Sequence, residues 1–110
     1  MISYSDFEKV DIRVGTIIDA KFNNKTIKPS IYLTIDFGEK IGKKKSSAQI
    51  TKNYLPKELV GKQIAAVINF SPKQIGKMIS EVLVLGFPDI DNDPVLIMPS
   101  KKVSNGKKLF

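Results

Sequence analysis

Apolar and polar residues alternate along four stretches of the chain, and a fifth, the last in sequence, is almost wholly apolar; both patterns predict β-strands. The stretches cover residues 11–22, 31–37, 45–51, 63–70 and 81–85. Gly15, inside the first stretch, predicts a bend or bulge that lets a long strand curl across two sheets. Pro72 has no backbone N–H to donate, so we expect the fourth strand to end after Phe70. Phe70 itself is expected on the apolar face of that strand. The pattern indicates an all-β protein.

Two short segments carry helix signals instead. Residues 5–8, Ser-Asp-Phe-Glu, match a capping box, and residues 56–60 begin with proline and precede Gly61. Five strands with a short helix between the third and fourth is the order of an OB-fold, a small Greek-key barrel. We therefore predict one domain: a five-stranded OB-fold barrel over residues 11–86, with an N-terminal extension over 1–10 and a C-terminal extension over 87–110.

The OB-fold also predicts where a ligand would lie. Ligands of this fold cover the second and third strands, between loops that here correspond to residues 23–30 and 71–79. The second loop is expected to be a long cationic turn that contains Gly76. The turn over residues 38–44 carries a lysine run, Lys43, Lys44 and Lys45, beside the same face.

The positive charge is concentrated in the middle of the chain. The net charge is +7, yet residues 40–80 contain nine lysines and one acid, whereas the remaining residues nearly balance. This segregation favours a polyanionic partner, although a solvated lysine surface that only aids solubility is the alternative. Arg13 is the single arginine, and lysine acts on phosphate as a point charge, which favours recognition of backbone and shape.

Cysteine and histidine are both absent. Their absence excludes disulfides, the usual zinc site, the Ser-His-Asp triad and imidazole base catalysis. Asp89, Asp91 and Asp93 alternate like half of a calcium loop, but the glycine and glutamate that complete such a loop are missing. We expect no enzyme activity, no metal and no cofactor. The chain shows no signal peptide and no apolar run of membrane-spanning length, so a cytoplasmic location is expected.

Several motifs together carry a family likeness. They are DIRVG at 11–15, SSAQIT at 46–51, VINF at 67–70 followed by Pro72, SEVLVL at 80–85 and Asn105-Gly106. The combination resembles the tRNA-binding domain family, which includes EMAP-II-like cytokines and the C-terminal domain of some methionyl-tRNA synthetases. The likeness is closest to its stand-alone, export-related chaperone branch, CsaA. It implies an OB-fold whose terminal extensions build a homodimer, binding to tRNA, and a chaperone activity toward polypeptides.

The resemblance also implies which residues face RNA. These are Ser47, Gln49, Asn69, Lys73 and Ser80, to which the charge pattern adds Lys77 and the lysine run Lys43, Lys44 and Lys45. Asn69 is expected to contact a base or ribose, the alternative being an amide that satisfies the end of the fourth strand. Tyr32 could stack on a base or cover a dimer contact, and we favour the contact.

A late apolar run predicts the assembly. Val95, Leu96, Ile97 and Met98 lie between two prolines, and both faces of this run are apolar. We expect it at a two-fold interface with the N-terminal segment. The predicted function is a dimeric tRNA-binding protein with export-related chaperone activity. The alternative is a chaperone for unfolded or pre-secretory polypeptides, with RNA binding incidental.

Overall fold

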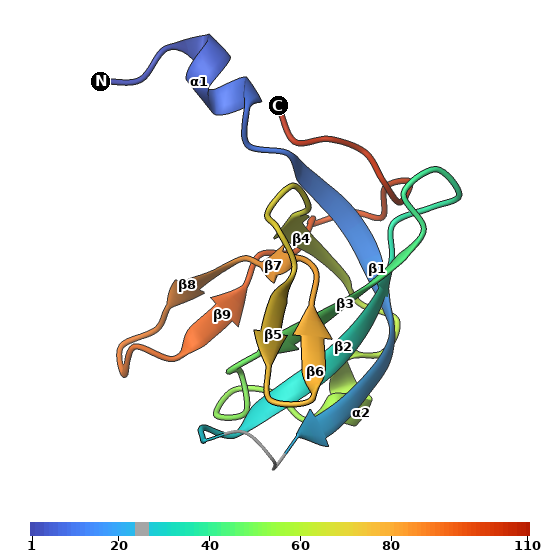
Figure 1. Cartoon of the computed structure of the whole chain (residues 1–110), viewed down its shortest axis with the longest axis vertical. Helices are drawn as coiled ribbons and strands as arrows, with labels where there is room; N and C mark the ends of the chain where they lie inside the picture. Colours follow the sequence, from blue (N-terminus) through green and yellow to red (C-terminus); the bar gives the residue numbers. More distant parts are fainter. Residues whose placement is uncertain (24–26) are drawn as a thin grey trace.

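A curled five-stranded antiparallel sheet forms the body of the protein, with the strands in the order β3-β2-β1-β4-β7 (Figure 1). The computed structural model describes residues 1–23 and 27–110, so residues 24–26 of the expected loop at 23–30 lie outside it. Two hairpins, β5–β6 and β8–β9, are attached to the sheet. The elements are α1 (Tyr4–Glu8), β1 (Ile12–Asn23), β2 (Ser30–Asp36), β3 (Lys43–Ala48), α2 (Pro56–Leu59), β4 (Gln63–Val67), β5 (Lys73–Ile75), β6 (Met78–Ser80), β7 (Leu83–Val84), β8 (Gly86–Pro88) and β9 (Pro94–Leu96).

The first strand, β1, is long enough to pair with two neighbours. Its beginning pairs with β4 and the rest pairs with β2. The register shifts between Ile17 and Asp19, so the irregularity lies there and the bulge expected at Gly15 is a wrong prediction. Gly15 is needed for packing instead, because a Cβ at that position would lie 2.6 Å from the Ile35 side chain.

Contacts between β3 and the segment that follows β6 bring the two ends of the sheet together. The Glu81 N–H donates to the Lys45 carbonyl at 2.8 Å. The buried Ser46 hydroxyl donates to the Val82 carbonyl at 3.0 Å. The strand order and the short helix α2 between β3 and β4 therefore confirm the OB-like fold expected from the sequence.

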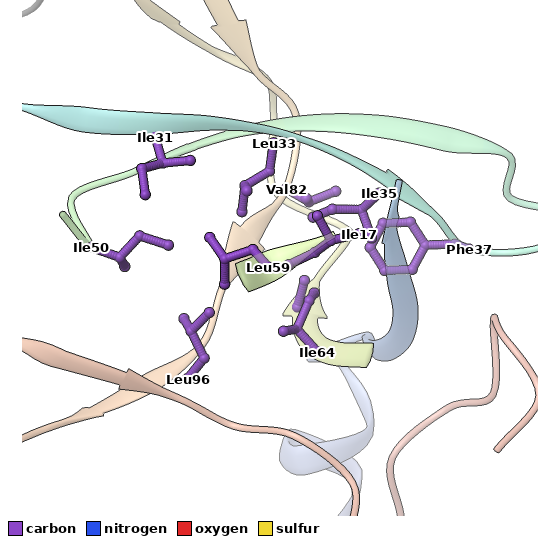
Figure 2. Packing of buried hydrophobic residues seen from close by; sticks show 11 residues of the cluster. Ile17, Ile31, Leu33, Ile35, Phe37, Ile50, Leu59, Ile64, Val82 and Leu96 are labelled. Carbon is purple, nitrogen blue, oxygen red and sulfur yellow. The ribbon is translucent and has the colours of Figure 1, made fainter. Parts of the chain in front are cut away.

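Apolar side chains from the sheet and from α2 fill the interior (Figure 2). Figure 2 shows Leu59 of α2 among Ile17 of β1 and Leu96 of β9, and all three are buried. Burial of one leucine side chain stabilises the fold by roughly 1.5–3 kcal/mol. The helix begins as expected, with Pro56 in its first turn and the Glu58 carboxylate accepting the Leu55 N–H at 3.0 Å.

Several strand boundaries differ from the sequence prediction. The third strand begins at Lys43, so the lysine run lies on β3 and not on a turn. The fourth strand ends at Val67, and the next residue still bonds to the segment before β1, where the Ile68 N–H donates to the Asp11 carbonyl. The last barrel strand, β7, is only two residues long, whereas the sequence predicted a strand over residues 81–85. The expected long turn at 71–79 contains the β5–β6 hairpin.

Both ends of the chain lie outside the barrel core. The helix α1 starts after Ser3, whose hydroxyl accepts the Asp6 N–H, so the capping box is formed by this pair and not by residues 5–8. The C-terminal residues run along β1, where the Gly106 N–H donates to the Val14 carbonyl at 2.7 Å. Across the described ranges, no helix is long and apolar enough to cross a membrane.

Candidate nucleic-acid interface

The β5–β6 hairpin lies over the β2–β3 side of the sheet (Figure 1). Two hydrogen bonds hold it there: the Ser47 N–H donates to the Ser80 hydroxyl at 3.0 Å, and the Tyr32 hydroxyl donates to the Ile79 carbonyl at 3.2 Å. The Lys45 ammonium lies over the Tyr32 ring, 5.8 Å from the centroid of that ring. The tyrosine predicted to cover a dimer contact or to stack on a base thus anchors the hairpin.

Two adjoining grooves lie beside the hairpin and share Ser47 and Ile75. The lining of the first groove includes Lys28, Ser30, Ser47, Gln49, Ile75 and Gly76. The lining of the second groove includes Ser47, Phe70, Lys73, Ser80, Glu81 and Leu83. Ser47 stands between the two grooves because its strand passes under the hairpin. The surface offers hydroxyls, an amide and cations around hollows with mainly apolar walls.

The structure brings most of the predicted RNA-facing residues together. Ser47 and Gln49 come from β3 and the residue just after it, while Lys73 and Ser80 come from the hairpin. All four line one groove or the other. Lys77 is exposed in the hairpin turn, next to Gly76 of the first groove. Five residues spread over 34 positions of sequence, from 47 to 80, thus surround one surface.

Asn69 lies apart from this group and bonds to the N-terminal segment. Its carboxamide oxygen accepts the Asp11 N–H at 3.0 Å, and its amide nitrogen donates to the Lys9 carbonyl at 2.7 Å. Both polar groups of the side chain therefore join the end of β4 to the residues that lead into β1. This geometry corresponds to the structural alternative, and an RNA contact by Asn69 stays a prediction.

The three lysines of the run have different surroundings. Lys44 is on the more buried side of β3, and its ammonium lies 3.9 Å from the Glu81 carboxylate. The Lys45 ammonium donates to the Thr34 hydroxyl at 2.6 Å. Lys43 is exposed at the start of the strand, opposite Asp36 in the register. Because strand residues alternate between faces, the run presents two cations to one side and one to the other.

Sequence reasoning missed two residues of the second groove, Phe70 and Glu81. Phe70 was expected on the apolar inner face, but β4 ends before it and its side chain is 58% exposed. The Glu81 carboxylate accepts the Lys45 N–H at 3.0 Å and lines the groove beside Lys73. The sequence does contain a signal that could have identified Glu81: it is an acid directly after Ser80, which was predicted to face RNA.

The apolar run at 95–98 divides between the inside and the surface. Leu96 is only 7% exposed and packs in the core of its own chain, so one face of the run is already covered. Val95 is 44% exposed and Met98 is 37% exposed. The half-buried Ile97 donates its N–H to the Leu85 carbonyl. Val95 and Met98 are the residues of the run available to a partner.

The aspartates after β8 cap a turn. The Asp89 carboxylate accepts the N–H groups of Asp91 and Asp93 and the Asn53 amide, each at 2.9 Å. The Asn53 hydrogen bond is the main reason why the pKa of Asp89 is lowered from its ordinary value. Among the residues that the structure describes, no group of three or more acidic, cysteine or histidine side chains could hold a metal ion.

Comparison with known proteins identifies the family. The family model described as "Putative tRNA binding domain" matches residues 12–108. Methionine–tRNA ligase from Porphyromonas gingivalis is 33% identical over 108 residues, and that from Methanothrix thermoacetophila is 37% identical over 109 residues. These matches cover 98% and 96% of this chain but 15% of each ligase. The chain thus spans about 15% of the length of these relatives.

Solved structures of similar size agree with this assignment. Chaperone CsaA from Bacillus anthracis is 46% identical with a TM-score of 0.92, and covers 100% of this chain and 99% of its own. The CsaA chaperone protein from Picrophilus torridus is 50% identical with a TM-score of 0.92, and both chains are covered completely, at 100%. From the match over residues 12–108 and these likenesses, the chain belongs to the tRNA-binding domain family.

Proposed function

We propose that this chain is a non-catalytic, dimeric tRNA-binding protein that recognises the shape and backbone of tRNA with the surface around its two grooves. The observation that carries the proposal is the hydrogen bond from the Ser47 N–H to the Ser80 hydroxyl at 3.0 Å. It holds the hairpin lysines Lys73 and Lys77 beside the polar groups of β3. Family membership supports tRNA as the polyanion.

The chemistry of the surface suits phosphate and ribose. Lysine ammonium groups attract phosphate without the fixed fork of an arginine, so they tolerate a variable backbone path. The Ser47 hydroxyl and the Gln49 amide beside them can exchange hydrogen bonds with ribose hydroxyls. Contacts of this kind fix the position and orientation of the nucleic acid, and binding should weaken steeply as salt rises.

Exposed apolar side chains outside the barrel support the dimer. No residue of α1 is buried, and Tyr4 in that helix is exposed. Val95 and Met98 are exposed as well. A second copy of the chain related by a two-fold axis would cover such surfaces on both protomers at once.

The test compares nucleic acids of different shape at two salt concentrations. Fluorescence anisotropy with total tRNA and with a DNA duplex of similar charge would measure both affinities at about 50 mM and 200 mM salt. The proposal predicts tighter binding of tRNA at both concentrations, with a fall in affinity between them. Equal affinity for the two nucleic acids would contradict shape recognition, and a salt-independent affinity would contradict backbone binding.

A second candidate function is the binding of unfolded or pre-secretory polypeptides. Three half-exposed apolar side chains, Phe70, Ile79 and Leu83, lie on or beside the grooved surface and could contact apolar peptide segments. The two CsaA proteins of similar structure are named as chaperones. Apolar peptide binding should be insensitive to salt. Suppression of aggregation of a denatured client that persists at high salt, where tRNA binding is lost, would support this function.

A further inference from the structure

The position of Glu81 points to a ligand with hydrogen-bond donors. Glu81 lines the second groove together with Lys73. A carboxylate repels phosphate and only accepts hydrogen bonds. A groove that served the phosphate backbone alone would be weakened by it. The groove therefore suits a group that brings donors to this carboxylate.

The other walls of the second groove suit a flat apolar ring. The Phe70 ring is 58% exposed at the groove and Leu83 is 50% exposed. The groove has a volume of about 600 Å³, enough for a ligand larger than an ion. Proteins that bind single-stranded RNA stack unpaired bases on aromatic side chains and hydrogen-bond their edges. A nucleobase is the part of an RNA that offers both a flat face and donors.

We propose that the second groove binds one unstacked guanine from a single-stranded part of the RNA. The ring lies against Phe70, the N1–H and N2 amine of its Watson–Crick edge donate to the two oxygens of Glu81, and Lys73 contacts a neighbouring phosphate. Guanine is chosen because it is the base with two adjacent donors on that edge, whereas uracil, adenine and cytosine each offer one donor group there. This inference rests on the proposed tRNA-binding function.

The carboxylate is held in place before the ligand arrives. One oxygen of Glu81 accepts the Lys45 N–H at 3.0 Å, and the other lies 3.9 Å from the Lys44 ammonium. The backbone of Glu81 is fixed as well, because its N–H donates to the Lys45 carbonyl at 2.8 Å. Each carboxylate oxygen has two lone pairs, so acceptor capacity remains for a base. A side chain held in this way loses less conformational entropy on binding.

The first experiment leaves the protein unchanged and varies one base. Seven-residue RNAs of uracil, with guanine, inosine, adenine or uracil at the central position, are titrated by fluorescence anisotropy. Guanine is expected to bind about tenfold more tightly than uracil, in the range of a bidentate base contact. Inosine lacks the N2 amine and should lose most of this preference. Equal affinity for all four oligomers would overturn the inference.

The second experiment changes the carboxylate. Glu81→Gln keeps an oxygen for the Lys45 N–H but replaces one acceptor by a donor. It should abolish the preference for guanine and raise the affinity for the all-uracil oligomer, because a negative charge near phosphate is removed. Glu39→Gln removes the same charge at an exposed turn position and should keep the preference. Equal weakening of all four oligomers by Glu81→Gln would show that Glu81 only holds the hairpin to β3.

The two proposals fail in different ways. If the wild-type protein binds tRNA but shows no preference for guanine, the proposed guanine site is refuted and the proposed function stands. If it binds neither tRNA nor any oligomer, the proposed function fails together with the base site. Since the inosine comparison needs no protein variant, a folding defect of Glu81→Gln would not prevent a decision.

Discussion

Ser47 and Ser80 are joined by a hydrogen bond of 3.0 Å, with the Ser47 N–H as donor and the Ser80 hydroxyl as acceptor. The two residues belong to β3 and to the hairpin strand β6, which are separated by 33 positions in the chain. This bond places the cationic hairpin beside β3 and creates the boundary between the two grooves. The binding surface depends on it.

Replacement of Ser80 should therefore affect both stability and binding. Ser80→Ala leaves the Ser47 N–H without this acceptor, at a cost of about 1 kcal/mol in the free energy of unfolding. We expect a severalfold loss in tRNA affinity because the hairpin is held less firmly. Urea unfolding and anisotropy measure the two quantities. Ser100→Ala, at an exposed bend, is the control, and equal effects of both substitutions would contradict the role of Ser80.

Asn69→Ala separates the two interpretations of Asn69. The structure shows both polar groups of its side chain bonded to the backbone of Lys9 and Asp11. We expect the substitution to lower the free energy of unfolding by about 1–2 kcal/mol, because two hydrogen bonds are lost at an exposed site. The tRNA affinity of the folded protein should change little. A large loss of affinity at unchanged stability would instead support the RNA contact predicted from the family resemblance.

Gly106 provides a test of the packing at the C-terminal tail. Its φ is +88°, and a Cβ there would overlap the Phe37 carbonyl oxygen. Gly106→Ala should destabilise the fold by more than about 2 kcal/mol, since strain and overlap add. Gly42 has a similar φ of +82° with nothing within 4 Å of its added Cβ, so Gly42→Ala should cost only about 1 kcal/mol. An equal loss of stability in the two variants, measured by thermal or urea unfolding, would show that the contact of the C-terminal tail is unimportant.

Light scattering tests the proposed dimer. We expect a mass of about twice the chain mass of 12.2 kDa at micromolar concentration. Val95→Asp would place a charge on an exposed apolar position and should shift the protein toward the monomer. Val60→Asp makes the same change at an exposed position at the end of α2 and should leave the mass unchanged. A wild-type monomer would contradict the proposal.

The barrel could be predicted from the sequence because its strands carry a strong alternation of apolar and polar residues. Ile31, Leu33 and Ile35 are all buried, as their period of two requires. The proline and glycine that flank α2 likewise marked the short helix. Local sequence is sufficient where the core selects one face of a strand.

The binding surface was less predictable because it depends on contacts between distant residues. The strands β5 and β6 have three residues each, too few for a clear alternation. Phe70 is exposed because β4 ends before it, which no local pattern reveals. The role of Glu81 depends on its pairing with Lys45, 36 positions away. Sequence therefore indicated the chemistry of the surface but not which residues meet there.

The salt dependence of tRNA affinity for a hairpin double variant tests the central claim most directly. Lys73→Ala with Lys77→Ala removes two cations from the hairpin, whereas Lys101→Ala with Lys102→Ala removes the same charge from the C-terminal extension. If the hairpin contacts phosphate, the first variant should lower the slope of log affinity against log salt by about 1.4–1.8, and the second should leave the slope near that of the wild type. The same slope for the wild type and the hairpin variant would contradict the account, because tRNA would then bind elsewhere on the molecule.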